Sequence, residues 1–333
     1  MHTRLFAIPA LIATAAFALS GCAATPTANG SDAALKIVTT TTQVADLTRA
    51  VVGDAPDVSL TQLIQPNQTA HSYDPSVADL TALGSADVLV INGLGLEEWL
   101  SDAIDASGFD GVTIDASHDV SVLGSEVGAE DKPGEAEEHA ERTDGDPHIW
   151  TDVRNAETMV KTIEEGLTGA GGSDAALFTA NAADYSAKLA SLESWIQENV
   201  AAVPAAERLL VSNHDALGYY TAAYGITYVG AVIPSFDDNA EPSAAAIDTL
   251  VSAIAATGVK AVFSEASLSP KMADTIANEA NVTVYAGDDA LYVDSLGPQG
   301  SAGDSYLKAQ IHNTTLILES WDAAPTALPS NLQ

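Results

Sequence analysis

The stretch DAALFTANAADYSAKLASLESWIQENVAAV, residues 174–203, decides the fold. Its apolar side chains recur at every third or fourth position, which is the spacing of one helix face; they are Leu177, Tyr185, Leu189, Leu192, Ile196, Val200 and Val203. Pro204 follows and cannot continue a helix. About 28 helical residues span about 42 Å, which is long for an element inside one compact lobe. We therefore predict that this helix joins two lobes.

Strand-like and helix-like segments alternate on both sides of this helix. Before it, we expect strands at 36–42, 58–64, 87–91 and 112–115 and helices at 44–52, 75–83, 96–106 and 155–167. After it, we expect strands at 208–212, 226–233, 259–263 and 282–286 and helices at 242–256, 270–280 and 305–320. Such alternation is typical of parallel βαβ units. We predict an α/β protein of two βα lobes with mainly parallel sheets: an N-terminal lobe over 35–172, a linking helix over 173–204 and a C-terminal lobe over 205–333.

The N-terminus carries a leader. Residues 1–21 combine the basic Arg4 with an apolar stretch too short to span a bilayer stably, as in a signal peptide. LSGC at 19–22 resembles the bacterial lipobox, in which the cysteine is lipidated, and an ordinary secretory signal is the alternative. We expect Cys22 to hold the protein on the outer face of the cytoplasmic membrane, periplasmic if the source is Gram-negative, with 22–34 as a flexible tether.

Composition narrows the possible functions. With 333 residues and 47% hydrophobic residues, the chain can form two packed cores. Its formal charge of −34 argues against nucleic acid, whose phosphates require lysine and arginine. Residues 124–146 are rich in carboxylates and predict a mobile acidic loop. Cys22 is the only cysteine, so a metal site in the mature protein must use nitrogen and oxygen ligands.

Four polar motifs each follow a predicted strand or lie in the loop beyond one. They are HSYDP at 71–75, DPHIW at 146–150, NHDALGYY at 213–220 and YVDSLGP at 292–298. Imidazole and carboxylate are common ligands of transition metals. Because α/β sheets bind ligands beyond the carboxyl ends of their strands, the motifs can converge. We predict one metal site in the cleft between the lobes, with four ligands: His71, His148, His214 and Asp294.

At these motifs the chain resembles the solute-binding lipoproteins of zinc and manganese ABC importers, and the resemblance covers nearly the whole mature chain. It implies two α/β lobes joined by one long helix, a metal ion at their interface, and delivery to a membrane permease with its ATPase subunits. No catalysis is required for that role, and we expect a monomer.

The residue at 214 bears on metal choice. In the resembled family, manganese-preferring members often have glutamate at this position and zinc-preferring members have histidine. Imidazole suits Zn(II) and added oxygen suits Mn(II), so His214 favours zinc, with manganese as the alternative. The acidic loop departs from the histidine-rich insertion of many zinc importers. Asp288 and Asp289 compete with Asp294 for the role of acidic ligand.

Three further carboxylates are candidates to support the ligands by hydrogen bonding to their imidazoles. They are Asp74, Asp215 and Glu265. A local hydrogen bond is the alternative for Asp74, a helix N-cap or first-turn position for Asp215, and a surface position for Glu265. His118 and His312 have no partner motif, and we treat both as incidental.

A zinc hydrolase is the main alternative from another class. Catalytic zinc sites usually have three protein ligands and a water, whereas four protein ligands fill a tetrahedral shell. The sequence also has no HExxH helix and no GxSxG turn. We therefore predict a binding protein and not an enzyme.

Overall fold

The computed structural model describes residues 35–124, 145–171 and 174–333. The predicted signal peptide, Cys22 with its tether, and nearly all of the predicted acidic loop lie outside these residues. No helix of the described part is long and apolar enough to cross a membrane.

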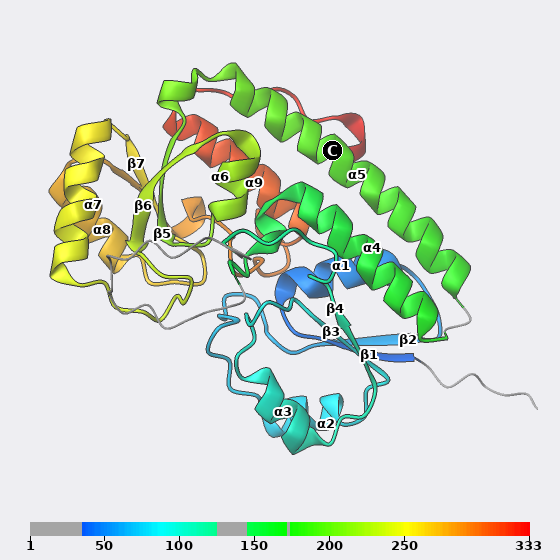
Figure 1. Cartoon of the computed structure of the whole chain (residues 1–333). Coiled ribbons are helices and arrows are strands. Elements are labelled where there is room, and N and C mark those ends of the chain that lie inside the picture. The colour runs from blue at the N-terminus through cyan, green and yellow to red at the C-terminus, as the bar shows by residue number, and fades with distance from the viewer. Residues whose placement is uncertain (1–34, 125–144, 172–173) are drawn as a thin grey trace, which may run out of the picture. The chain divides into compact units, whose positions relative to one another are not determined.

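The N-terminal half is built on one parallel sheet with strand order β2-β1-β3-β4. The strands are β1 (Leu35–Thr39), β2 (Val58–Gln62), β3 (Val88–Ile91) and β4 (Val112–Asp115). The helices are α1 (Thr42–Val52), α2 (Val77–Leu83), α3 (Leu100–Ser107) and α4 (Val153–Gly169). Successive side chains of a strand point to opposite faces. Accordingly, Ile37 packs with residues of α1 and α4, and Val38 packs with residues of α2 and α3. These two pairs of helices lie on opposite sides of the sheet (Figure 1).

The C-terminal half repeats the βα plan with two short parallel pairs. Strand β5 (Leu209–His214) pairs with β6 (Thr227–Ile233), and β7 (Ala261–Phe263) pairs with β8 (Thr283–Tyr285). The helices are α6 (Gly218–Tyr224), α7 (Ala244–Thr257), α8 (Lys271–Ala280) and α9 (Tyr306–Ser320). Helices α7 and α8 pack against these strands, while α9 contacts the long helix (Figure 1).

The long helix α5 (Ala175–Ala202) connects the two halves, which confirms the predicted α/β fold. Asn181 near its start donates to Val51 O of α1 at 3.0 Å, whereas Trp195 near its end donates to Thr326 O at 3.1 Å. Its first turns therefore pack on the N-terminal half and its last turns on the C-terminal tail. The division into lobes at residues 172 and 204 stays a prediction.

Helix α3 begins later than its apolar pattern predicts. The pattern indicates a helix from residue 96, but α3 starts at Leu100. The carboxylate of Glu97 accepts hydrogen bonds from the backbone N–H groups of Asn92 and Gly93 and from the Thr40 hydroxyl. These bonds hold residues 92–97 in a turn that joins the ends of β1 and β3.

Candidate metal centre

His71 lies in the irregular segment that follows β2. Its backbone N–H donates to Thr69 Oγ1 at 3.2 Å, and the neighbouring Ala70 carbonyl accepts from Trp99 Nε1 at 2.9 Å. Nδ1 of its ring has no hydrogen-bond partner among the described residues. The loop backbone, not a bond to the ring, therefore places this imidazole.

His148 immediately precedes the short 3-10 helix η1 (Ile149–Thr151). Oδ1 of Asp146 accepts from the backbone N–H of His148 at 2.9 Å and lies 2.8 Å from its ring Nδ1. A second donor, Asn92 Nδ2, binds the Pro147 carbonyl at 3.0 Å. The motif Asp-Pro-His thus supplies both a ligand candidate and the carboxylate that orients it.

His214 is the last residue of β5, two residues beyond the end predicted for that strand. Glu265, which follows β7, approaches it from the neighbouring strand. Its Oε1 lies 2.5 Å from Nδ1 of His214 and accepts from the His214 backbone N–H at 3.2 Å. Strands β5 and β7 lie side by side, so the fold fixes this pair.

Asp294 lies in the loop after β8. Its carboxylate faces the three imidazoles, with 3.3 Å from Oδ2 to His71 Nε2, 3.1 Å from Oδ2 to His214 Nε2 and 3.6 Å from Oδ1 to His148 Nε2. Asp288 and Asp289, the competing candidates, lie exposed in the 3-10 helix η3 (Gly287–Asp289) and are not among the clustered side chains.

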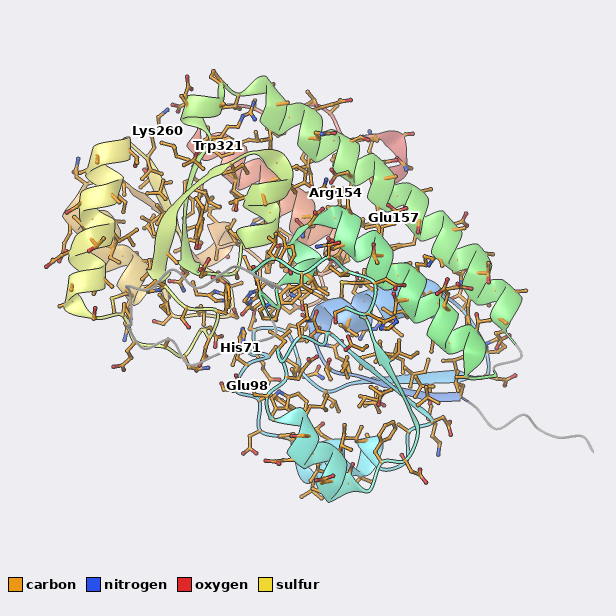
Figure 2. All side chains as sticks on the ribbon, viewed as in Figure 1. His71, Glu98, Arg154, Glu157, Lys260 and Trp321 are labelled. Carbon is orange, nitrogen blue, oxygen red and sulfur yellow. The ribbon has the colours of Figure 1, made fainter. Side chains whose placement is uncertain are left out.

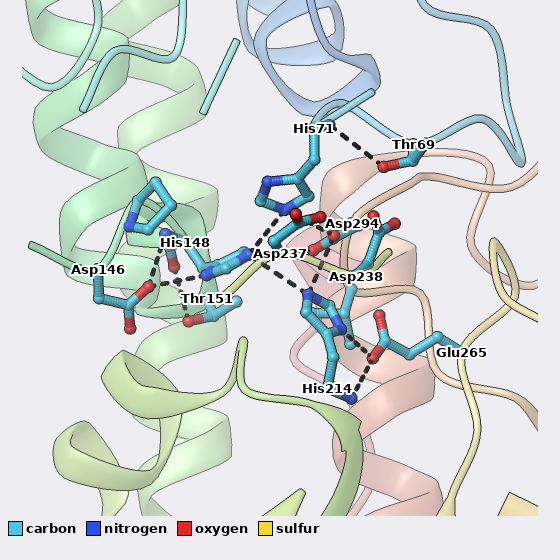
Figure 3. A network of polar contacts seen from close by, with 12 residues as sticks. Thr69, His71, Asp146, His148, Thr151, His214, Asp237, Asp238, Glu265 and Asp294 are labelled. Atoms are coloured by element: carbon cyan, nitrogen blue, oxygen red, sulfur yellow. Dashed lines mark hydrogen bonds and ion pairs between the residues drawn. The ribbon is translucent and has the colours of Figure 1, made fainter. Parts of the chain in front are cut away.

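The structure brings the four predicted side chains together in one buried cluster (Figure 3). His71, which belongs to this cluster, lies where the two halves meet (Figure 2). The Nε2 atom of His148 is 3.3 Å from that of His71 and 3.4 Å from that of His214. Ligands that bind one ion tetrahedrally at about 2.0–2.1 Å lie about 3.3–3.4 Å from one another. These two separations match edges of such a tetrahedron, and the four candidate ligand atoms all lie within 4.8 Å of one another.

Hydrogen bonding also sets the tautomers of two imidazoles. Asp146 and Glu265 accept only if Nδ1 of His148 and of His214 carries the proton. Nε2 of each neutral ring is then a lone-pair donor that points into the cluster. This carboxylate–imidazole arrangement is the usual support of metal-binding histidines.

The electrostatics of the cluster favour a cation. Burial opposes charge on His214, but the carboxylates of Asp294 and Glu265 outweigh burial and raise the pKa of His214 well above its ordinary value. Burial also acts against the charge of Asp294, yet His214 and His148 outweigh it and leave the pKa of that carboxyl well below its ordinary value. For Glu265, burial dominates and raises the pKa.

The other predicted carboxylates have different positions. Asp74 is exposed and does not belong to the cluster. Asp215 is half-buried and hydrogen-bonds to Tyr228, and because α6 begins only at Gly218 it does not cap that helix. Glu265 contacts a ligand candidate directly. Sequence reasoning missed Asp146, although its place two residues before a candidate imidazole was a usable signal.

The incidental histidines lie outside the cluster. His118 is exposed, and Nε2 of His312 hydrogen-bonds to the Ala290 carbonyl at 3.0 Å.

This buried three-histidine, one-aspartate centre between two βα halves can be compared with known families. The family model described as zinc-uptake complex component A, periplasmic, matches residues 37–320. The chain belongs to this family. Zinc-uptake component A proteins are substrate-binding parts of transporters and not enzymes, which agrees with the prediction of a binding role without catalysis.

Individual relatives of this chain carry names with either metal. The manganese-binding lipoprotein MntA of Halalkalibacterium halodurans is 30% identical over 306 residues, covering 91% of this chain and 94% of the relative. The manganese ABC transporter substrate-binding lipoprotein PsaA of Streptococcus pneumoniae serotype 4 is 27% identical, with coverage of 91% and 94%. The periplasmic zinc-binding protein TroA from Treponema pallidum aligns with a TM-score of 0.75 at 25% identity, covering 86% of this chain and 98% of TroA.

Proposed function

We propose that this protein captures Zn(II) with His71, His148, His214 and Asp294 and delivers it to an ABC-type permease with its ATPase subunits. The observation that carries the proposal is the convergence of three imidazole nitrogens and one carboxylate within 4.8 Å of one another, with five of their separations at 3.1–3.6 Å. Burial of all four side chains excludes most water, so the protein supplies the complete ligand set.

The ligand chemistry supports zinc as the substrate. Zn(II) is commonly four-coordinate with nitrogen and oxygen ligands, and three imidazoles are soft enough to favour it over Mn(II). Mn(II) is the alternative, because several relatives are named as manganese-binding lipoproteins. Asp294 could bind Mn(II) through both carboxylate oxygens. Among the described residues, neither oxygen has a polar partner other than the three imidazoles.

Lipid attachment at Cys22 would keep the captured ion near the permease on the outer face of the cytoplasmic membrane. Relatives named as lipoproteins support this location. We propose further that the protein acts as a monomer, since two halves of one chain supply all four ligands.

Metal content measured by mass spectrometry on the purified protein, followed by competition between Zn(II) and Mn(II), tests the proposal. We expect one equivalent of zinc that manganese does not displace. Because zinc often wins in vitro on intrinsic affinity, expression of the gene should also rise when zinc is withdrawn. Tight manganese retention against zinc would reassign the substrate, and absence of any bound metal would overturn the proposed function.

A further inference from the structure

The loop that carries Asp294 leaves the C-terminal half at Tyr292. Up to that residue its hydrogen bonds are with C-terminal elements. Leu291 O accepts from Ala266 N at 2.9 Å, and Tyr292 N donates to Asn313 Oδ1 of α9 at 2.9 Å. The first part of the loop is therefore an extension of the β7–β8 region.

The next main-chain contacts, at Val293, Ser295 and Leu296, are with the N-terminal half. The carbonyl oxygen of Val293 accepts from Gln43 Nε2 at 2.7 Å and from Trp150 Nε1 at 2.9 Å. Two more bonds follow: Leu296 N donates to Thr42 Oγ1 at 2.8 Å, and Asn67 N donates to Ser295 Oγ at 2.8 Å. The segment around Asp294 is thus docked on the N-terminal half.

The two bonds to Val293 O act directly on Asp294. The carbonyl of Val293 and the N–H of Asp294 belong to one planar peptide group. Two donors on that oxygen, from the start of α1 and from η1, fix the orientation of the plane and hence the Cα of Asp294. Gln43 and Trp150 are 1% and 2% exposed, so water does not readily replace either donor.

This inference rests on the proposed function. We propose that Gln43 and Trp150 are positioning residues for Asp294, which hold the acidic ligand from the half of the protein opposite to the one that encodes it. Neither side chain needs to touch the ion. Their effect is to keep the carboxylate facing the three imidazoles, so their loss should speed release of the ion.

The test replaces each donor by an apolar side chain, and the control below undergoes the same loss of volume as the tryptophan variant. Trp150→Phe removes the indole N–H and retains an aromatic ring beside His148, and Gln43→Met removes the amide. Trp195→Phe is the matched control, because Trp195 is also buried and also donates to a backbone carbonyl, that of Thr326. The release rate of Zn(II) to an excess of chelator is measured by stopped flow, and the absorption spectrum of the Co(II)-loaded protein reports the coordination geometry.

We expect release about tenfold faster in each single variant, as for loss of one buried hydrogen bond, and an altered cobalt spectrum. Trp195→Phe should keep the wild-type rate and spectrum. Wild-type rates and spectra in both site variants, or an equal change in Trp195→Phe, would overturn the positioning role.

A separate control keeps this inference distinct from the proposed function. If wild-type protein binds zinc and His71→Ala does not, the metal site stands whatever the two positioning variants show. If the wild-type protein binds neither Zn(II) nor Mn(II), the proposed function and this inference both fail. The melting temperature of each metal-free variant shows that it is folded before release is measured.

Discussion

Oε1 of Glu265 lies 2.5 Å from Nδ1 of His214 and 3.2 Å from the backbone nitrogen of the same residue. One carboxylate oxygen thus fixes both the ring and the main chain of a ligand candidate. Asp146 makes the same pair of contacts with His148, at 2.8 and 2.9 Å. Repetition of this arrangement at two imidazoles explains how both rings present Nε2 to one point.

Glu265→Gln should weaken metal binding although it removes no ligand. The amide oxygen can still accept from Nδ1 of His214, so the tautomer is preserved, but the negative charge that makes the imidazole a better donor is lost. We expect a 10- to 100-fold lower affinity, roughly the range found for partners of metal-binding histidines. Competition with a chromophoric chelator measures it. Glu193→Gln, a change far from the cluster, should have no effect, and an affinity within twofold of wild type for Glu265→Gln would contradict the argument.

His214→Glu should shift preference from zinc towards manganese only after a second change. The new carboxylate would face Glu265 at close range, and two neighbouring carboxylates cannot readily both ionise. We therefore expect His214→Glu alone to lose affinity for both metals. His214→Glu combined with Glu265→Gln should recover binding with a lower zinc-to-manganese affinity ratio, because oxygen donors suit Mn(II). Calorimetric titration with each metal gives the ratio, and an unchanged ratio in the double variant would rule out position 214 as a selectivity determinant.

Metal affinity should fall as the pH falls, starting above the ordinary histidine pKa. A metal ion and a proton compete for Nε2 of His214, and the carboxylates of Asp294 and Glu265 raise the pKa of His214 against the opposing effect of burial. Competition therefore begins above about pH 6.5, the ordinary value. Titrations in buffers of different ionisation enthalpy should show proton release on binding near neutral pH. A flat affinity profile between about pH 8 and 5 would exclude histidine ligation.

Metal affinity should rise with pH, whereas the stability of the metal-free protein should fall at high pH. For His214, whose pKa is raised in the folded state, the stabilisation is complete below about pH 6.5 and is lost as the pH rises through the folded-state value. For Asp294, whose pKa is lowered, stabilisation is present above about pH 4 and is lost as the pH falls through the folded-state value. Chelator-treated protein should therefore melt at its highest temperature between these limits. A melting temperature that rises steadily above pH 7 would contradict this ion pair.

Strong local signals made most of the fold predictable from sequence. The apolar period and Pro204 set the long helix to within one residue at each end, because no tertiary contact overrides so long a pattern. The start of α3 was predicted too early, since the decisive bonds of Glu97 run to Thr40 and to the backbone of residues 92–93. Thr40 and Glu97 are 57 residues apart in the sequence, so their hydrogen bond does not affect the local apolar pattern from which helices are predicted.

The candidate ligands were predictable for a different reason. Each is an imidazole or carboxylate at the end of a strand or in the chain that follows one, and parallel topology brings such positions together. What holds them could be predicted only in part: Glu265 was a candidate because it follows a strand. Gln43 and Trp150 could not be recognised, because their common partner is a backbone carbonyl, which no residue type identifies.

His148→Ala should abolish the stabilisation that metal gives to the folded protein. A ligand at a free concentration of 100 times its dissociation constant stabilises the native state by about 2.7 kcal/mol. For a chain of this size, we expect that stabilisation to raise the melting temperature of the wild-type protein by roughly 5 °C. Nε2 of His148 lies 3.3 Å from that of His71 and 3.4 Å from that of His214, so it is the nitrogen next to both other imidazoles. His148→Ala removes this nitrogen ligand. We expect no metal-induced shift in His148→Ala at zinc concentrations that saturate the wild type. His118→Ala, at an exposed histidine outside the cluster, should keep the full shift. A full shift in His148→Ala would mean that zinc binds elsewhere on the chain.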